Sequence, residues 1–293
     1  MYKNIAANKR NTIFIMFGFV VLIAAIGYVF ALYYQDWTIA LTVLFIAAIY
    51  AIFQYYAASH LAVAMTGAHK IKKKDCPRLY NTVENLTLTA GLPMPEVYII
   101  DDPAPNAFAS GRDPSHALVC ATTGLLDIMN DKELTAVMAH EVSHIKNYDI
   151  RVSTIVFGLV CLIGFIADIG WRINYYGGRR SRDEDRSLVS AVILLITAIV
   201  APLAASLAQM AVSREREYLA DSSAALLTRY PEGMISALKK LETHAQPMKR
   251  QNPATEAMFI ANPLNSKSLN NLFSTHPPLE KRIERLENGK TKF

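Results

Sequence analysis

The sequence predicts an integral membrane protein in which apolar helical hairpins are joined to a soluble α+β domain. Hydrophobic residues make up 52% of its 293 residues and only 19% are charged, against about a quarter in average soluble domains. This composition excludes an intrinsically disordered chain. Three cysteines without paired spacing exclude a disulfide scaffold and favour a reducing compartment. The net charge of +5 is too modest to indicate nucleic-acid binding.

Two apolar runs without a charged residue open the chain, at residues 13–34 and 37–58. Each has about 22 residues, or roughly 33 Å of helix, enough to cross a hydrocarbon core of about 30 Å. The first run is too long for a cleaved signal peptide, so we expect a retained anchor. Basic residues flank the outer ends of this hairpin, at 3–10 and 70–74, and none lies at its tip. The positive-inside rule therefore places the N-terminus and the following domain in the cytoplasm.

Two further apolar runs, residues 152–171 and 188–212, predict a second helical hairpin. The loop between them carries five arginines and three acidic residues, which disfavours an external location. Asp168 and Pro202 also weaken the two runs as membrane spans. Two interpretations remain open, a transmembrane hairpin and an apolar hairpin buried against protein. Both return the chain to the side from which it started.

Between the hairpins, residues 70–150 have the pattern of a soluble α+β unit. Residues 96–100 and 117–121 are short β-rich runs and predict strands. A helix is predicted from Asn130 to Asn147, because Asn130 can cap it and apolar residues recur at helical spacing.

After the second hairpin, residues 213–229 again predict a helix, and 245–275 read as a polar loop. Pro277 and Pro278 are expected to open a last helix. The chain is thereby divided into an N-terminal transmembrane hairpin, the first part of a cytoplasmic domain, an inserted apolar hairpin and the second part of the domain, at residues 1–60, 61–151, 152–212 and 213–293.

The predicted helix at 130–147 contains the pattern His140-Glu141-Val-Ser-His144. Four helical residues turn by about 400°, so the two imidazoles lie on one face and can share a metal ion. Glu141 stands beside them, where it can hold a water molecule at the metal without being a ligand. The alternative interpretation is a pair of histidines on a helix surface.

A third ligand is available on the helix that follows the second hairpin. Glu217 and Asp221 are four residues apart on one face, so one carboxylate can bind zinc while the other accepts the spare N–H of a ligand histidine. Two histidines and one glutamate leave the fourth zinc position open, as catalytic zinc requires. Glu215 is a rival ligand, but it points about 200° away from Glu217 around a helix. In isolation, this acidic group could also be a solvated charged turn.

Three separated motifs resemble the HtpX family of membrane-integrated zinc metalloproteases, which is related to the CAAX prenyl proteases. The motifs are the His140–His144 pattern with Asp149 behind it, the Ser-Arg-Glu-Arg-Glu-Tyr-Leu-Ala-Asp block at 213–221, and Ser-Thr-His-Pro-Pro at 274–278. The resemblance extends over essentially the whole chain. It implies a gluzincin-like zinc-metallopeptidase domain in a stress-associated endopeptidase that degrades misfolded membrane proteins. The protein would lie in the inner membrane as a multi-pass protein with its active site in the cytoplasm.

The resemblance also implies roles for individual residues. One zinc ion per chain would be held by His140, His144 and Glu217, with Glu141 as the general base and Asp221 supporting a ligand histidine. His276 matches a histidine near the catalytic centre, and could help to stabilise the oxyanion or merely cap the last helix. Residues Asn106, Ala107, Phe108 and Ala109 resemble a substrate-facing edge strand.

Each of the less specific residues has a structural alternative. Asn106 follows a proline and could be a turn residue. Asp149 lies about 140° from His144 on a continuous helix, and we expect a structural role for it at the helix end.

Two rival functions are weighed against the endopeptidase. A CAAX-type prenyl-peptide protease would need a large chamber, which four spans are too few to build. A catalytically silent zinc-binding membrane scaffold would not need Glu141 or an open ligand set. We expect protein substrates and a lipid bilayer as partners, whereas the sequence does not indicate an oligomeric state.

Overall fold

The computed structural model describes all residues except 1, 177–213, 257, 263–276 and 290–293. The chain begins with a pair of long antiparallel helices, α1 (Tyr2–Tyr34) and α2 (Trp37–Thr66). Asp36 caps α2 by accepting a hydrogen bond from the Thr38 amide, and Gly67 ends it in a left-handed conformation with φ of 72°. The helix thus continues beyond the predicted boundary at residue 60, because the apolar pattern continues to the glycine.

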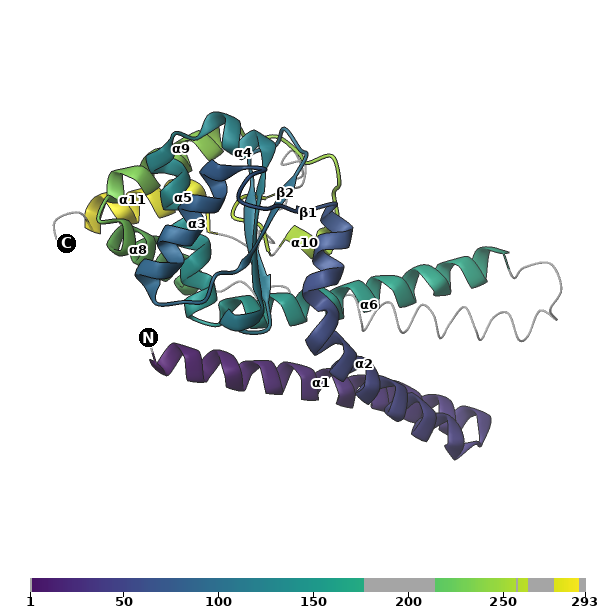
Figure 1. Ribbon diagram of the computed structural model, residues 1–293. Coiled ribbons are helices and arrows are strands. Elements are labelled where there is room, and N and C mark those ends of the chain that lie inside the picture. Colours follow the sequence, from purple (N-terminus) through teal and green to yellow (C-terminus); the bar gives the residue numbers. More distant parts are fainter. Residues whose placement is uncertain (1, 177–213, 257, 263–276, 290–293) are drawn as a thin grey trace.

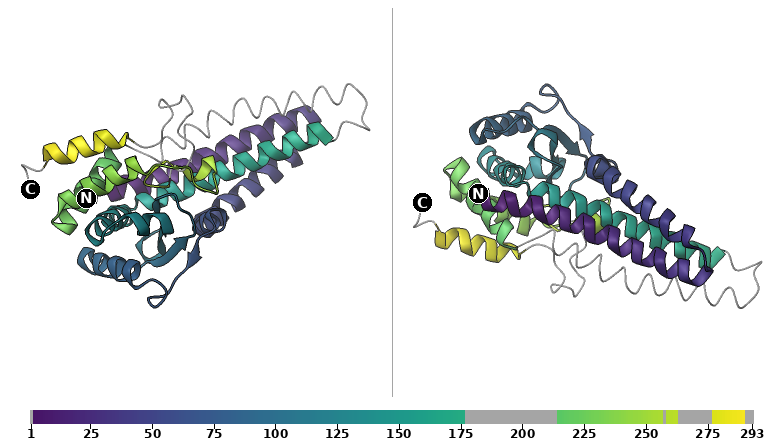
Figure 2. Two further views of the ribbon diagram at one scale, coloured as in Figure 1. Left: turned by 90° about the horizontal axis from the view of Figure 1, so that it is seen from above. Right: turned by 90° about the horizontal axis from the view of Figure 1, so that it is seen from below.

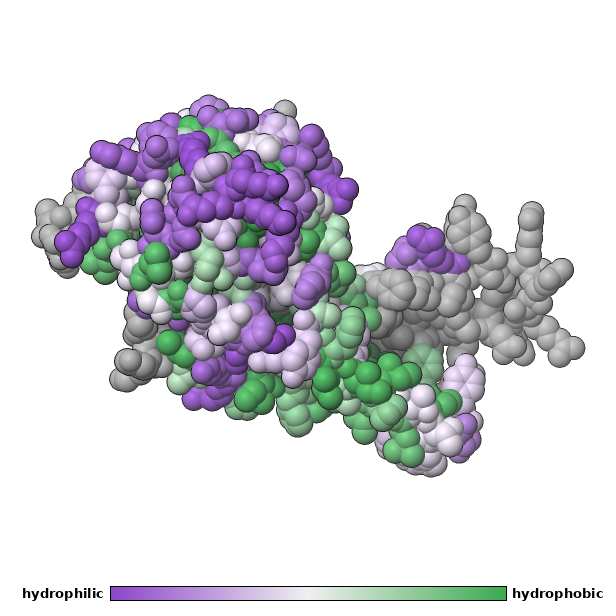
Figure 3. Space-filling view, viewed as in Figure 1, coloured by the Kyte–Doolittle hydropathy of each residue, from purple (hydrophilic) through white to green (hydrophobic). Residues whose placement is uncertain are grey.

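Helices α1 and α2 have the surface of a membrane anchor. Segments of 28 and 30 residues in them, Ile5–Leu32 and Trp37–Thr66, are long and apolar enough to cross a bilayer. Their outward side chains are large and apolar, including Ile13 and Leu41, each 67% exposed. This apolar surface runs along the hairpin, whereas the globular part is largely hydrophilic (Figure 3). The protein is therefore a membrane protein.

The globular part contains a four-stranded mixed sheet in the order β1-β2-β4-β3. Its strands are β1 (His69–Lys70), β2 (Glu96–Ile100), β3 (Ala107–Gly111) and β4 (Ala117–Thr122). The two strands predicted from β-rich runs, β2 and β4, are present and pair in parallel. Strand β3 pairs antiparallel with β4 and forms one of the two edges of the sheet.

The sheet separates two layers, because alternate residues of each strand face opposite sides. Val97 and Val119 pack into the main core with the soluble helices. Tyr98 and Cys120 face the other side, where they pack against the ends of the apolar helices, for example Phe157. In Figure 1 most of the soluble helices lie on one side of the sheet and α2 lies on the other, while α1 passes below both.

The soluble helices form the layer that carries the functional site. The described helices of the globular part are α3 (Pro77–Ala90), the 3-10 helix Pro114–His116, α4 (Thr123–Ile128), α5 (Asp131–Lys146), α8 (Arg214–Thr228), α9 (Pro231–Thr243), α10 (Pro253–Glu256) and α11 (Leu279–Gly289). Helix α5 packs against β3, α3, α8 and α9, and the C-terminal α11 packs on α8 and α9.

Of the predicted second apolar hairpin, only the first arm lies within the described residues, as helix α6 (Asp149–Tyr176). The first half of α6 packs against α1, through Val152, Ile155 and Val156 on one side and Ile15 and Phe19 on the other. The three long helices run side by side in both views of Figure 2. The predicted return arm at 188–212 lies outside the described residues.

Candidate metal centre

Helix α5 presents the two histidines of the predicted motif. Asn130 accepts a hydrogen bond from the Glu133 amide while the Glu133 carboxylate accepts one from the Asn130 amide, so the expected capping box starts the helix. One face of α5 carries His140 and His144 at helical spacing, and their Nε2 atoms lie 3.1 Å apart. The two rings are nearly perpendicular, at 88°.

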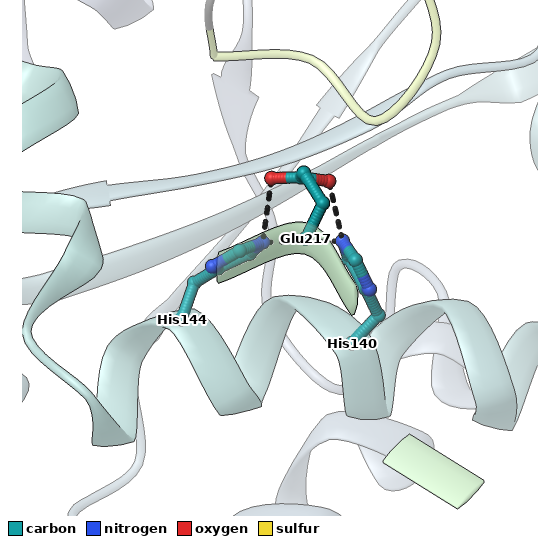
Figure 4. Close-up of side chains that lie close together, drawn as sticks. All are labelled: His140, His144 and Glu217. Carbon is teal, nitrogen blue, oxygen red and sulfur yellow. Dashed lines mark hydrogen bonds and ion pairs between the residues drawn. The ribbon is translucent and has the colours of Figure 1, made fainter. Parts of the chain in front are cut away.

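Glu217 of α8 completes a three-residue cluster with these histidines. Its two carboxylate oxygens lie 3.5 Å from His140 Nε2 and 3.5 Å from His144 Nε2 (Figure 4). The rival Glu215 points away, is 77% exposed and lies 3.6 Å from Arg285. The two histidines and Glu217, which are separated in the sequence by more than 70 residues, therefore meet in the fold.

The spacing of the three side chains fits one zinc ion. Ligand atoms about 2.0–2.1 Å from a tetrahedral zinc lie about 3.3 Å from one another, close to the 3.1 Å and 3.5 Å separations in this cluster. Two imidazoles and a carboxylate are also a donor set that zinc accepts. Each remaining histidine nitrogen faces a carboxylate, as is usual for metal ligands.

The support of His140 is buried within the soluble domain. Its Nδ1 lies 3.0 Å from Asp221 Oδ1, on α8. Asp221 in turn accepts two hydrogen bonds from Arg282 of α11, at 2.8 Å and 2.6 Å. All three side chains are at most 2% exposed. Burial lowers the pKa of His140, but hydrogen bonds to Asp221 and Glu217 outweigh it and raise the pKa to about 9.

The support of His144 comes from the apolar helices. Its Nδ1 lies 3.0 Å from Asp149 Oδ2, at the start of α6. The other Asp149 oxygen accepts a hydrogen bond of 2.7 Å from Asn8 of α1. The expected placement of Asp149, 140° from His144 on a continuous helix, is wrong. Helix α5 ends at Lys146, and Tyr148 adopts a positive φ of 61°, so the chain turns and brings Asp149 back to the histidine.

Glu141, the predicted general base, is close enough to both histidines for their charges to affect its pKa. It is adjacent to His140, and it is 2% exposed. Burial raises the pKa of its carboxyl group, an effect that the nearby histidines and Arg282 oppose. A carboxylate whose proton affinity is raised in this way is suited to accept and return a proton.

The segment predicted to face substrate lies on and next to the edge strand. Ala107, Phe108 and Ala109 belong to β3, and Asn106 precedes it. All four are buried. The outer edge of β3 is covered at this point by residues 258–261, which form an antiparallel bridge between Phe108 and Phe259. His276 lies outside the described residues, and its role stays a prediction.

A buried His-Glu-x-x-His helix, joined by a glutamate from a later helix and flanked by an edge strand, defines a class of metallopeptidases. The chain belongs to peptidase family M48, whose family model matches residues 73–290. It is therefore a metallopeptidase, and the predicted enzyme class is confirmed.

Two curated relatives that align with nearly the whole chain share one printed name. The chain is 53% identical to "Protease HtpX homolog" of Tropheryma whipplei (strain Twist), with all of both chains covered. It is 46% identical to the protein of the same name from Ligilactobacillus salivarius (strain UCC118), with 98% of this chain and 99% of that protein covered. The resemblance to the HtpX family is thus confirmed.

A solved structure supports the fold. The crystal structure of S. mikatae Ste24p matches with a TM-score of 0.50 and 17% identity, over 96% of this chain and 64% of that chain. At this identity the match concerns the fold alone. This chain spans less than two thirds of that structure's length.

Three residues that support the candidate metal ligands, Arg282, Asn8 and Asp149, were not predicted to do so from the sequence. Arg282 lies three residues after Leu279 and four before Leu286, so its spacing places it on the buried face of α11. A charged residue at such a position signals a buried partner. Asn8 and Asp149 meet through a contact between distant helices, for which the sequence carries no local signal.

Proposed function

We propose that this protein is a zinc-dependent endopeptidase that hydrolyses peptide bonds of misfolded or damaged membrane proteins. The observation that carries the proposal is the cluster of His140, His144 and Glu217, with one carboxylate behind each histidine. Such a set binds one zinc and leaves a position open for water or substrate. Zinc bound there would polarise the scissile carbonyl group and lower the pKa of water.

The chain's own residues supply the proton transfers. Glu141 accepts a proton from the attacking water and passes it to the departing amine. Its burial raises its proton affinity, which helps the first transfer, and excludes competing solvent. Asp221 and Asp149 keep each histidine in the tautomer that leaves Nε2 free to bind metal.

The edge strand β3 holds the substrate backbone. An extended peptide that adds to a sheet edge is bound through main-chain hydrogen bonds, which suits an enzyme that accepts many sequences. The Asn106 side chain and the Ala107 carbonyl group are the polar groups that face this edge.

The setting of the site supports membrane proteins as substrates. Helices α1 and α2 would anchor the protein in the bacterial inner membrane, with the N-terminus and the active site in the cytoplasm. The full-length relatives are named HtpX proteases, and we assign the same role in protein quality control to this chain. A protease anchored in this way meets substrates that are embedded in the same bilayer.

The two rival functions predict different results. A prenyl-peptide protease would cleave only prenylated peptides, whereas an endopeptidase would also cleave unmodified unfolded proteins. A scaffold would bind zinc and cleave neither. The presence of Glu141, which a scaffold does not need, argues against the last alternative.

The test is cleavage of casein by the detergent-purified, zinc-loaded protein beside its Glu141→Gln variant. We expect the wild type to cleave and the variant to lose about 10²–10⁴-fold in rate while keeping its zinc, because general base catalysis contributes that much. Metal analysis of both proteins controls for loading. Equal cleavage by both zinc-loaded proteins would contradict the role of Glu141, and absence of cleavage by both would contradict a broad endopeptidase.

A further inference from the structure

Residues 258–261 contact the outer edge of β3 through a single isolated bridge, between a turn at Met258 and a bend at residues 260–261. Phe259 bridges Phe108 in antiparallel pairing, and their rings make an edge-to-face contact with centroids 5.1 Å apart. Met258, Phe259 and Ile260 are 7%, 1% and 2% exposed. This part of the chain is therefore seated on the sheet edge and does not merely pass over it.

The polar contacts of this segment are those that an extended peptide makes. The Ile260 amide donates to the Ala107 carbonyl group at 2.9 Å. The side-chain amide of Asn106 binds Ala261 at two points, donating to its carbonyl group at 2.8 Å and accepting from its N–H at 3.2 Å. These contacts involve only backbone atoms of the segment, so they would hold any extended backbone.

The segment also reaches the metal centre. The Ile260 carbonyl group lies 3.4 Å from Arg282 Nη1. The same guanidinium nitrogen is 3.5 Å from Glu217 Oε2, and Arg282 Nη2 is 3.4 Å from the His140 ring. A backbone carbonyl group of residues 258–261 is therefore separated from two candidate zinc ligands by a single side chain.

We propose that residues 258–261 are an internal ligand in the substrate-binding position, which a substrate must displace. The inference rests on the proposed role of the β3 edge. It also indicates the substrate class. Because the segment buries the large apolar side chains of Phe259 and Ile260 at this position, we expect substrates to be extended segments with similar side chains. Segments of this kind are buried in folded proteins and become available when a protein unfolds.

Displacement has a measurable consequence. If only the fraction of molecules with the segment displaced can bind, the apparent affinity for a peptide is reduced by that fraction. Weakening the segment's own contacts should therefore tighten peptide binding. A substitution that damages a genuine part of the binding surface would weaken it.

The experiment uses the full-length, zinc-loaded Glu141→Gln protein in detergent, so that binding is measured without cleavage. The probe is a fluorescent peptide that repeats residues 258–262. Ile260→Pro removes the N–H that donates to Ala107, and we expect it to tighten peptide binding about threefold to tenfold, the worth of one such hydrogen bond. Phe259→Ala, which loses the ring contact with Phe108, should also tighten it.

Gln251→Pro is the matched control, because it places a proline at an exposed position of the same connection. We expect it to leave the peptide affinity unchanged. Unchanged or weaker binding by both Ile260→Pro and Phe259→Ala would overturn the inference. If Ile260→Pro does not fold, Phe259→Ala and the next measurement decide.

Amide hydrogen exchange in the protein with an unaltered segment gives an independent answer. Peptide binding should speed exchange at Ile260 and Ala261, because the peptide takes their acceptors. Continued protection of both amides in the peptide complex would overturn the inference. Peptide binding and amide exchange are both measured without catalysis. If the variants bind peptide more tightly but the wild type cleaves no casein, the proposed function is rejected and the inference about residues 258–261 stands.

Discussion

The two histidines of the metal centre are supported by opposite halves of the molecule. His140 is held by Asp221 and Arg282, from helices of the soluble domain, and its side chain is 1% exposed. His144 is held by Asp149 and Asn8, from α6 and α1, and its side chain is 15% exposed. The first support contains a fully buried ion pair with two short hydrogen bonds. In the second, a neutral amide donates to the carboxylate, and the Arg216 guanidinium of α8 lies 3.9 Å from it.

This difference shows how a membrane anchor can be part of a catalytic centre. If both histidines were supported by the soluble domain, α1 and α6 would only attach it to the bilayer. Instead, the position of His144 depends on how these two helices pack. We therefore expect damage on the His140 side to reduce stability, and damage on the His144 side to reduce metal affinity.

The largest effect is expected for Asp221→Ala. The substitution removes the carboxylate that accepts two short hydrogen bonds from the buried Arg282, which keeps only Glu217 at 3.5 Å, and breaking such a pair costs about 3–5 kcal/mol. Urea unfolding in detergent should show this loss in the free energy of unfolding. Glu215→Ala on the same helix is the control, because its exposed pair with Arg285 should contribute about 0–1 kcal/mol. Similar losses for both variants would contradict a buried support of His140.

Asp149→Asn should separate metal affinity from stability. The side chain keeps its shape but loses the charge that orients His144, and losses of this kind reduce metal affinity about 10–100-fold. Competition with a chelator measures the affinity, and the same unfolding assay measures stability. A stability loss as large as that of Asp221→Ala, with zinc affinity intact, would reverse the proposed division.

Asn8→Ala tests whether the first helix contributes to the centre. Its amide donates to the charged Asp149, and a hydrogen bond to a charged group contributes about 1.5–3 kcal/mol. We expect zinc affinity to fall by about tenfold, because part of this energy orients His144. Thr12→Val, one turn along the same helix and equally buried, should leave the affinity unchanged. Equal zinc affinities of the two variants would count against this coupling.

The smallest effect on the metal centre is expected where α6 crosses α2. A Cβ atom at Gly158 would lie 1.2 Å from the side-chain nitrogen of the buried Gln54, so this side chain must move. Gly158→Ala should therefore cost about 1–3 kcal/mol in the free energy of unfolding, while zinc affinity stays unchanged. Gly164→Ala is the control, because no atom of the described residues lies within 4 Å of the new Cβ. Loss of zinc affinity in Gly158→Ala alone would show that packing also positions His144.

Prediction from the sequence succeeded where local patterns determine the structure. The capping box of Asn130 and Glu133 starts α5 as expected, and the spacing of His140 and His144 places both imidazoles on one face. Helical geometry predicts that only one of Glu217 and Glu215 can face the histidines, and the structure turns Glu217 toward them and Glu215 toward solvent.

Prediction failed where the chain leaves a regular helix. A continuous α5 directs Asp149 away from His144, and only the left-handed turn at Tyr148 reverses this. Non-glycine residues rarely adopt that conformation, so no local sequence pattern predicts it at Tyr148. The contact between Asn8 and Asp149 depends on the packing of α1 against α6, which joins residues remote in sequence.

The spread of the centre along the chain also determines when it can exist during synthesis. Asn8 is made first, the two histidines follow, Glu217 comes only after the inserted apolar hairpin, and Arg282 comes last. A partly synthesised chain that ends before α8 has two histidines but no third ligand. The full cluster with its buried support can therefore assemble only after residues 217 and 282 have been synthesised, when nearly the whole chain is available.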